Sequence, residues 1–175
     1  SGTRRFRTGF IEVARKNGKT FWAAAIGNYL AFADQEMGAE VYSAATKRDQ
    51  ARIAHGKAIK MVKRSPVLRR HIHSFKDNLN SEETGSKYEP LGADADTTDG
   101  LSVYGVIADE LHAWKSRDMW NVLETGTGSR RQPLMLAITT AGVDRNTICW
   151  EFHDYTQKVL QGIIDDDTWF GMIFT

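Results

Sequence analysis

Two nearly continuous apolar runs constrain the fold of this 175-residue chain more than any other feature. Residues 102–108 read SVYGVIA, and residues 133–140 read PLMLAITT. Such runs are typical of strands in a parallel sheet, because helices cover these strands on both faces. In open parallel sheets, ligands bind beyond the carboxyl ends of the strands. The polar residues that follow each run are therefore candidates for a binding or catalytic site.

The rest of the chain alternates between strand-like and helix-like patterns. We expect further strands at residues 9–13, 39–45 and 169–174, and short strands at 71–75 and 87–91 that could form a hairpin around a polar loop at 77–86. Residues 93–100 read as an acidic turn region. Helices are expected at residues 20–35, 47–64, 118–126 and 147–161. This alternation predicts an α/β fold with a mostly parallel central sheet flanked by helices.

The first two predicted helices carry expectations about burial. Helix 20–35 is apolar nearly throughout, so we expect it to be buried on most sides. Helix 47–64 offers Ile53, Ile59 and Val62 to the core. Its basic side chains would face solvent or a partner.

Residues 14–20 (ARKNGKT), here called the phosphate loop, join the first strand to the first helix. Backbone N–H groups at such a junction, helped by the helix dipole, bind phosphate. Lys19 would reach the β- and γ-phosphates and the Thr20 hydroxyl would ligate Mg²⁺. These loops normally begin with Gly where this chain has Val13, so a basic surface turn is the alternative. The nucleotide-binding residues would be Ala14, Arg15, Lys16, Asn17, Gly18, Lys19 and Thr20.

Asp109 and Glu110, here called the acid pair, directly follow the apolar run at 102–108. Burying an unpaired carboxylate is strongly unfavourable, so a buried carboxylate is normally paired. Mg²⁺ would supply that pairing for Asp109, and Glu110 could act as general base toward water. The alternative is an ordinary helix N-terminus, where acidic residues are favourable.

The second apolar run is followed by Thr139-Thr140-Ala141-Gly142. Its hydroxyls could contact a γ-phosphate or the attacking water, or could simply cap a turn. Because the carboxyl ends of parallel strands share one edge of a sheet, the phosphate loop, the acid pair and this segment should meet. Their order along the chain fits a single site for nucleotide hydrolysis.

The net charge of +1 conceals an uneven distribution of charge. Residues 1–76 sum to +11 and residues 77–175 to −10, and residues 47–76 hold ten Lys/Arg against one acid, Asp49. This segment could contact a polyanion or the acidic half of a neighbouring subunit, or could be a solvated helix face. Cys149 is the only cysteine, so no intrachain disulfide can form, which suits a reducing compartment. The apolar stretch 21–33 is too short to span a membrane.

Several stretches together resemble the ATPase domain of the large terminase subunit of tailed bacteriophages. They are ARKNGKT (14–20), AATKRDQARIAH (44–55), ADADTTDGLSVYGVIADELHAW (93–114), LETGTGSRRQPLMLAITTAG (123–142) and VLQGIIDDDTWFGMIF (159–174). The resemblance implies a P-loop NTPase of the RecA-like, ASCE type, over residues 3–175. It makes Asp109 the Mg²⁺ ligand and Glu110 the catalytic glutamate. It places Arg15 near the γ-phosphate as a sensor or charge stabiliser. Thr139, Thr140 and Gly142 would couple hydrolysis to motion.

The resemblance also implies a function and partners. The domain would hydrolyse ATP with Mg²⁺ to move double-stranded viral DNA into the procapsid, in the cytoplasm of the host cell. It would work as a homo-oligomeric ring with the portal and the small terminase subunit, and with no membrane. An arginine from a neighbouring subunit would assist, with Arg48, Arg52, Arg130 and Arg131 as candidates for this role or for DNA contact. We expect the family's nuclease domain to be absent, and Asp165-Asp166-Asp167 to form a turn rather than a metal site.

Two other functions are compatible with parts of the sequence. The GKT triplet, the DELH string at 109–112 and the Thr-rich segment would also suit a superfamily-2 helicase fragment, although Asn17 replaces a further loop Gly. A nucleotide-binding assembly module that does not hydrolyse is the other alternative. The five histidines are expected on the surface or in the core rather than at a metal.

Overall fold

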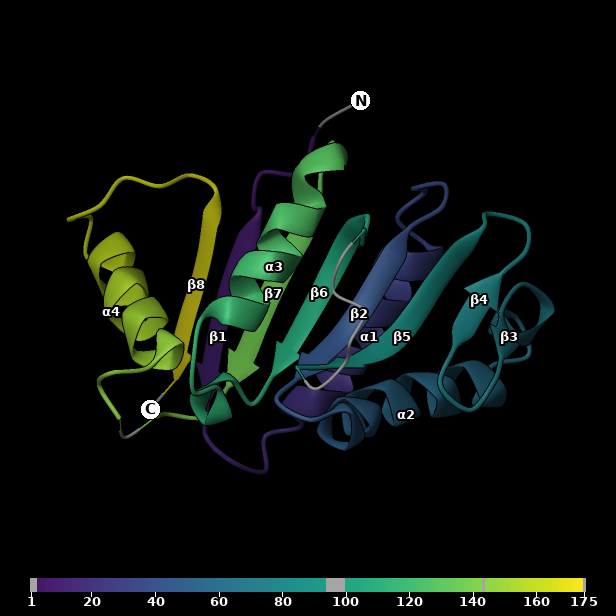
Figure 1. Ribbon diagram of the computed structural model, residues 1–175, viewed down its shortest axis with the longest axis horizontal. Helices are drawn as coiled ribbons and strands as arrows, with labels where there is room; N and C mark the ends of the chain where they lie inside the picture. The colour runs from purple at the N-terminus through teal and green to yellow at the C-terminus, as the bar shows by residue number, and fades with distance from the viewer. Residues whose placement is uncertain (1–2, 94–99, 143, 175) are drawn as a thin grey trace.

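The fold, seen in a computed structural model, is a single eight-stranded sheet with helices on both faces (Figure 1). The structure describes residues 3–93, 100–142 and 144–174. Most of the acidic turn expected at 93–100 lies outside these residues. The strand order is β3-β4-β5-β2-β6-β7-β1-β8. The predicted α/β class with a mostly parallel sheet is confirmed.

Six strands run parallel and form the body of the sheet. In spatial order they are β5 (Ser86–Gly92), β2 (Glu40–Ala45), β6 (Val103–Asp109), β7 (Leu134–Thr139), β1 (Thr8–Val13) and β8 (Trp169–Phe174). The central strand β6 is buried at all seven residues, as its apolar run predicts. The carboxyl ends of these strands point toward the lower edge of the sheet in Figure 1.

Two short antiparallel strands extend the sheet beyond β5, and here the sequence prediction was wrong. Strand β3 (His73–Ser74) does not pair with β5, because β4 (Leu79–Ser81) lies between them and pairs with both. Residues 79–81 fall within the loop expected at 77–86. A three-residue strand is too short to show a period-2 pattern, although Leu79 is completely buried and anchors it.

Helices α1 (Lys19–Phe32) and α2 (Arg48–Arg64) cover one face, and α3 (Asp118–Gly126) and α4 (Ile148–Leu160) cover the other (Figure 1). Three short 3-10 turns complete the elements, at Leu68–Arg70 (η1), Leu111–Ala113 (η2) and Thr127–Ser129 (η3). None of the helices in the described residues is long and apolar enough to cross a membrane.

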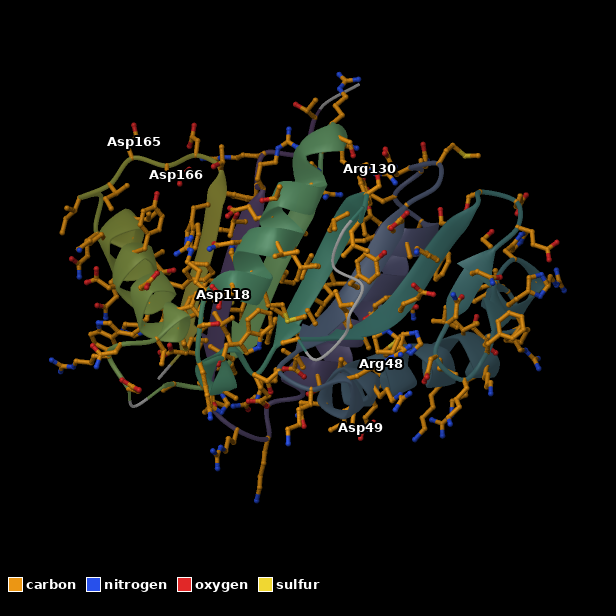
Figure 2. The ribbon with its side chains drawn as sticks, in the orientation of Figure 1. Arg48, Asp49, Asp118, Arg130, Asp165 and Asp166 are labelled. Atoms are coloured by element: carbon orange, nitrogen blue, oxygen red, sulfur yellow. The ribbon has the colours of Figure 1, made fainter. Side chains whose placement is uncertain are left out.

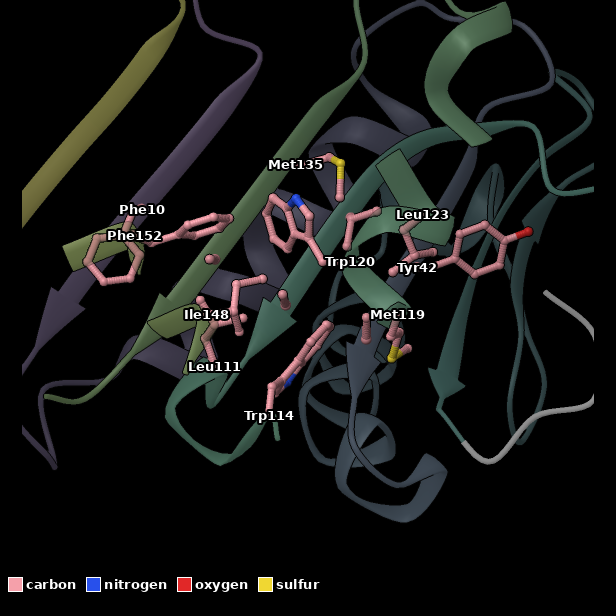
Figure 3. Packing of buried hydrophobic residues seen from close by; sticks show 14 of the residues in the cluster. Phe10, Tyr42, Leu111, Trp114, Met119, Trp120, Leu123, Met135, Ile148 and Phe152 are labelled. Atoms are coloured by element: carbon pink, nitrogen blue, oxygen red, sulfur yellow. The ribbon is translucent and has the colours of Figure 1, made fainter. Parts of the chain in front are cut away.

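A separate apolar core fills the space under each helix layer. Figure 3 shows the core beneath α3 and α4, where the Trp120 ring meets the Phe152 ring edge to face at 4.8 Å. Phe152 also packs against Phe10 of β1 and Trp169 of β8. This packing fixes α4 across the two strands that lie at the phosphate-loop side of the sheet.

Two burial expectations need correction. Helix α1 is not buried on most sides, because Phe21, Trp22 and Tyr29 are each more than half exposed while its alanines pack on the sheet. Ile53 of α2 is half exposed, although Val62 is buried and Ile59 packs against the core. Most of the buried residues in both helices are small, which allows close approach of helix and sheet, although Leu30 of α1 and Val62 of α2 are buried as well.

Candidate functional site

Three strand ends meet at one edge of the sheet, as the sequence predicts. Strand β7 lies between β1 and β6, so Thr139 pairs with Glu12 on one side and Ile138 pairs with Asp109 on the other. The phosphate loop follows β1 and the acid pair closes β6. All three segments therefore border the same space at the carboxyl edge (Figure 1).

The phosphate loop turns at two left-handed residues. Lys16 has φ 70° and Gly18 has φ 72°, while Val13 ends strand β1 as ordinary extended chain. The position usually taken by the first Gly thus needs no glycine here, because the turn is made later in the loop. Asn17 Nδ2 donates to the Ala14 carbonyl at 3.2 Å and tightens the turn. Residues 14–18 are exposed, so their backbone is open to a ligand.

Lys19 begins helix α1 and points at the acid pair. Its Nζ lies 2.7 Å from Oε1 of Glu110, and only 11% of the lysine side chain is exposed. The two residues that sequence reasoning assigned to phosphate binding and to water activation are thus in direct contact.

Asp109 is buried, with 6% of its surface exposed. Its carboxylate accepts a hydrogen bond from the Thr20 side chain and one of 3.0 Å from the Glu110 N–H. Burial, and next the negative charge of Glu110, raise the pKa of Asp109, while the Lys19 charge opposes this. A buried carboxylate beside a threonine hydroxyl is a ligand pair that suits Mg²⁺. Among the described residues no cluster of three or more His, Cys, Asp or Glu forms a closed metal cage, so phosphate oxygens and waters would complete the shell.

Glu110 adopts a left-handed backbone conformation, with φ 55° and ψ 46°. This conformation is uncommon for a non-glycine residue and is unfavourable by about 1–3 kcal/mol. The N–H of Glu110 donates to the Ile138 carbonyl at 3.0 Å, which holds the bend against β7. The bend directs the Glu110 carboxylate back toward Lys19.

His112, which the sequence analysis did not assign to the site, joins Glu110 to β7. Its Nδ1 lies 3.1 Å from Glu110 Oε2, 3.1 Å from Thr139 Oγ1 and 3.3 Å from Thr140 Oγ1. The backbone N–H of His112 also donates to Thr139 Oγ1 at 3.1 Å. The DELH string contained the signal, since this histidine stands two residues after Glu110.

The predicted coupling segment lies against His112. Thr139 and Thr140 are buried, and Thr139 Oγ1 donates to the Thr140 carbonyl at 2.9 Å. A Cβ on Gly142 would come within 3.5 Å of the His112 Cβ and 3.4 Å of the Cys149 sulfur. These are ordinary van der Waals distances, so Gly142 lies beside His112 without its glycine being required for space.

A polar cavity of about 410 Å³ opens beside these groups. Arg15, the acid pair and His112 line one part of it, and Lys47 and Gln50 at the start of α2 line another. Arg15 therefore faces the same space as Glu110, as expected for a group near the γ-phosphate. The cavity is large enough for a triphosphate end and its waters.

The four candidate arginines are dispersed. Arg52 pairs with Asp49 and Asp77 at 2.6 Å each. Arg130 binds Glu36 and the Gly38 carbonyl at the edge of the sheet opposite the phosphate loop, as Figure 2 shows. Arg131 is exposed beside it in sequence, and Arg48 lies at the start of α2, near the loop edge (Figure 2).

Asp165-Asp166-Asp167 lie in the connection from α4 to β8, also at the opposite edge (Figure 2). Asp166 accepts hydrogen bonds from Tyr155 and Thr168, and Asp167 pairs with Arg5. These bonds organise a turn, as the sequence analysis expected.

A further buried pair escaped sequence reasoning. Glu12 of β1 is 2% exposed, and its Oε2 lies 2.9 Å from Nδ1 of His153 on α4. The two residues are 141 positions apart, so their pairing leaves no local motif in the sequence.

The sequence matches the protein-family model described as "Terminase large subunit, ATPase domain" over residues 1–158. The chain belongs to this family. It is 32% identical to the large terminase subunit of Enterobacteria phage HK97 over 135 residues, which are 74% of this chain and 27% of that protein. It is also 38% identical to Protein YmfN of Escherichia coli (strain K12) over 77 residues, 44% of this chain and 17% of that one.

Solved structures of terminases share the fold. The crystal structure of the HK97 bacteriophage large terminase superposes with a TM-score of 0.80 at 25% identity, over 97% of this chain and 35% of that chain. The large terminase of a thermophilic bacteriophage in complex with ADP superposes with a TM-score of 0.64 at 14% identity, over 98% and 40%. The terminase domain described here therefore spans about a third of the HK97 chain. The predicted family and the P-loop fold class are confirmed.

Proposed function

We propose that this terminase domain hydrolyses ATP with Mg²⁺. The observation that supports this most directly is the 2.7 Å contact between Lys19 and Glu110. Through this contact, Lys19 and the acid pair, Asp109 and Glu110, converge on one site. A homologous terminase has been solved in complex with ADP, which supports a nucleotide in the equivalent fold. The helicase and non-hydrolysing alternatives are less well supported, because Lys19, Thr20, Asp109 and Glu110 are all retained and the family is that of terminases.

Residues of this chain would divide the work of phosphoryl transfer. The loop amides of residues 15–20 and the Lys19 ammonium would bind the β- and γ-phosphates, with Arg15 near the γ-phosphate. Thr20 and Asp109 would hold Mg²⁺, which neutralises phosphate charge when bound. Glu110, released from Lys19 by the incoming phosphates, would accept a proton from the attacking water. His112 and Thr139 would keep its carboxylate oriented.

We further propose that hydrolysis drives double-stranded viral DNA into the procapsid, in a ring of subunits that meets the portal and small terminase subunit in the host-cell cytoplasm. Family membership supports this role. The basic segment 47–76 would contact either DNA phosphates or the acidic half of the next subunit. If it contacts DNA, affinity should fall steeply with salt and be independent of sequence.

An arginine in trans would complete the charge stabilisation in that ring. Among Arg48, Arg52, Arg130 and Arg131, the ion pairs of Arg52 and Arg130 would have to break first. We therefore expect slow turnover by the monomer and faster turnover on assembly.

ATP turnover at increasing protein concentration, with and without Mg²⁺, tests the proposal. Turnover that requires Mg²⁺, is lost in Lys19→Ala and rises per subunit on assembly is the expected result. Mg²⁺-dependent ATP binding with no turnover at any concentration would support the non-hydrolysing alternative. Turnover per subunit that is the same in monomer and assembly would contradict the arginine in trans.

A further inference from the structure

A second cavity, of about 350 Å³, lies on the other side of the phosphate loop from the polar one. Here it is called the apolar pocket. It opens between the start of α1 and the neighbouring strands β1 and β8. Its lining residues are Ile11, Val13, Asn17, Lys19, Trp22, Ile138 and Phe174.

Two large aromatic side chains line this pocket without being covered by the fold. Trp22 is 57% exposed and Phe174 is 59% exposed. Trp22 lies one helical turn after Gly18, and its backbone N–H donates to the Gly18 carbonyl at 3.2 Å, so its backbone is held beside the phosphate loop. Phe174 pairs in register with Val13, the last residue before that loop. Both aromatic groups are therefore held within a few residues of the phosphate-binding backbone.

Lys19 connects the apolar pocket to the polar cavity through its ion pair. Lys19 lines the pocket, and its ammonium group reaches Glu110, which lines the polar cavity. A ligand whose phosphates lie on the loop amides thus has a polar, charged space at one end and an aromatic, apolar space at the other. A nucleotide has this polarity, with a charged triphosphate at one end and a flat base with π faces at the other.

We propose that the apolar pocket binds the purine base of the nucleotide, stacked against Trp22 and Phe174. The inference rests on the proposed function and adds to it the binding site of the base. Among the described lining residues, polar groups are limited to the Asn17 amide, the Lys19 ammonium and the Trp22 indole N–H, so we expect stacking rather than a hydrogen-bond pattern to determine affinity. Every base has a π face, so ATP and GTP should bind with similar affinity.

The test compares a ligand with a base to one without. Titration calorimetry would measure binding of Mg-ATP and of Mg-tripolyphosphate to the 175-residue chain and to Trp22→Ala, Phe174→Ala and Lys19→Ala. Trp22→Ala should weaken ATP binding about tenfold, the loss of one stacked base, and leave tripolyphosphate binding unchanged. Lys19→Ala should weaken both ligands. Trp22→Phe, which keeps an aromatic face, should recover most of the ATP affinity.

Tyr29→Ala is the matched control. Tyr29 is an aromatic residue of similar exposure on the same helix face, two turns or roughly 10 Å further from the loop. It should leave both affinities unchanged, and thermal melting would show that each variant is folded.

This inference alone would be overturned if neither Trp22→Ala nor Phe174→Ala changes ATP affinity while Lys19→Ala still weakens it. So would equal weakening of both ligands by Trp22→Ala. Self-association that is lost in Trp22→Ala with ATP affinity intact would assign these side chains to an interface and also overturn it. If the unaltered chain binds neither ligand, the proposed function fails as well.

Discussion

The ammonium group of Lys19 and the carboxylate of Glu110 form an ion pair of 2.7 Å across 91 residues of sequence. Glu110 therefore occupies the position in which Lys19 would bind phosphate. Lys19 in turn occupies the position in which Glu110 would bind the attacking water. In the proposed mechanism, nucleotide binding would break this pair before hydrolysis begins.

Replacing Glu110 by Gln separates binding from chemistry. We expect ATP turnover to fall about 10²–10⁴-fold, the usual contribution of a general base. ATP affinity should stay the same or increase a few-fold. In the variant Lys19 has no ion pair with residue 110 to break before it can bind phosphate. Turnover assays and calorimetry check this, with Glu151→Gln as the control because Glu151 pairs with Arg117 on the surface. A large loss of ATP affinity in Glu110→Gln would contradict the displacement of Lys19.

His112→Ala should impair the orientation of Glu110 without removing it. The variant loses the 3.1 Å contacts from Nδ1 to both Glu110 and Thr139. Because small misplacements of a catalytic group reduce the rate, we expect kcat to fall about tenfold, with KM for ATP nearly constant. Steady-state kinetics check the result. His71→Ala, which removes an exposed histidine paired with Glu83, should leave kcat unchanged, and an unchanged kcat in His112→Ala would refute the positioning role.

Asp109→Asn should stabilise the nucleotide-free protein while removing Mg²⁺-dependent activity. Burial and the negative charge of Glu110 disfavour the Asp109 carboxylate, and the Lys19 charge offsets only part of this. We expect the free energy of unfolding in urea to rise by about 0.5–2 kcal/mol, as is common when a functional polar group is neutralised.

Asp118→Asn provides the contrasting case. Asp118 lies in the first turn of α3 and accepts from the Ser116 hydroxyl at 2.9 Å. Its charge is favourable at a helix N-terminus, so this variant should be destabilised by about 0.3–1 kcal/mol. A change of the same sign in both variants would argue against a burial penalty at Asp109.

His55 should make stability depend on pH. Its ring is buried against Tyr88, its Nε2 lies 2.8 Å from the Tyr88 carbonyl, and burial lowers its pKa despite the nearby Asp77 and Glu89 carboxylates. Below about pH 6.5 the unfolded chain binds a proton that the folded protein excludes, so stability is full above this pH and is lost as pH falls toward the folded pKa.

The matching measurement is urea denaturation from about pH 8 to about pH 5. The free energy of unfolding should fall on acidification by up to about 1.4 kcal/mol per pH unit through this histidine. In His55→Gln, whose amide can still donate to Tyr88, this part of the slope should disappear. Identical slopes in the two proteins would show that His55 takes up its proton while folded.

The sequence alone was sufficient to predict the sheet class and the meeting of three strand ends. This worked because Asp109 and Thr139 follow long buried runs, and such runs are readable without tertiary information. Strand β4 was missed because three residues carry no periodicity. The outward direction of Trp22 was missed because a helix apolar on all sides does not reveal which side packs.

Contacts made by isolated polar residues were not predictable. The roles of His112 beside Thr139 and of His153 beside Glu12 depend on which strands become neighbours. Pairwise contacts between residues far apart in sequence leave no local pattern. The predicted roles of the phosphate loop, the acid pair, the segment at 139–142 and the four candidate arginines remain predictions.

The strand order has a consequence for how the protein forms during synthesis. Strand β1 has only two neighbours, β7 and β8, and these begin at Leu134 and Trp169. A nascent chain that emerges from the ribosome amino end first therefore carries its phosphate-loop strand unpaired until the last part of the domain has been translated. Such distant pairing slows folding. Any truncation that removes both late strands would leave β1 without a sheet, whatever the state of the loop sequence itself.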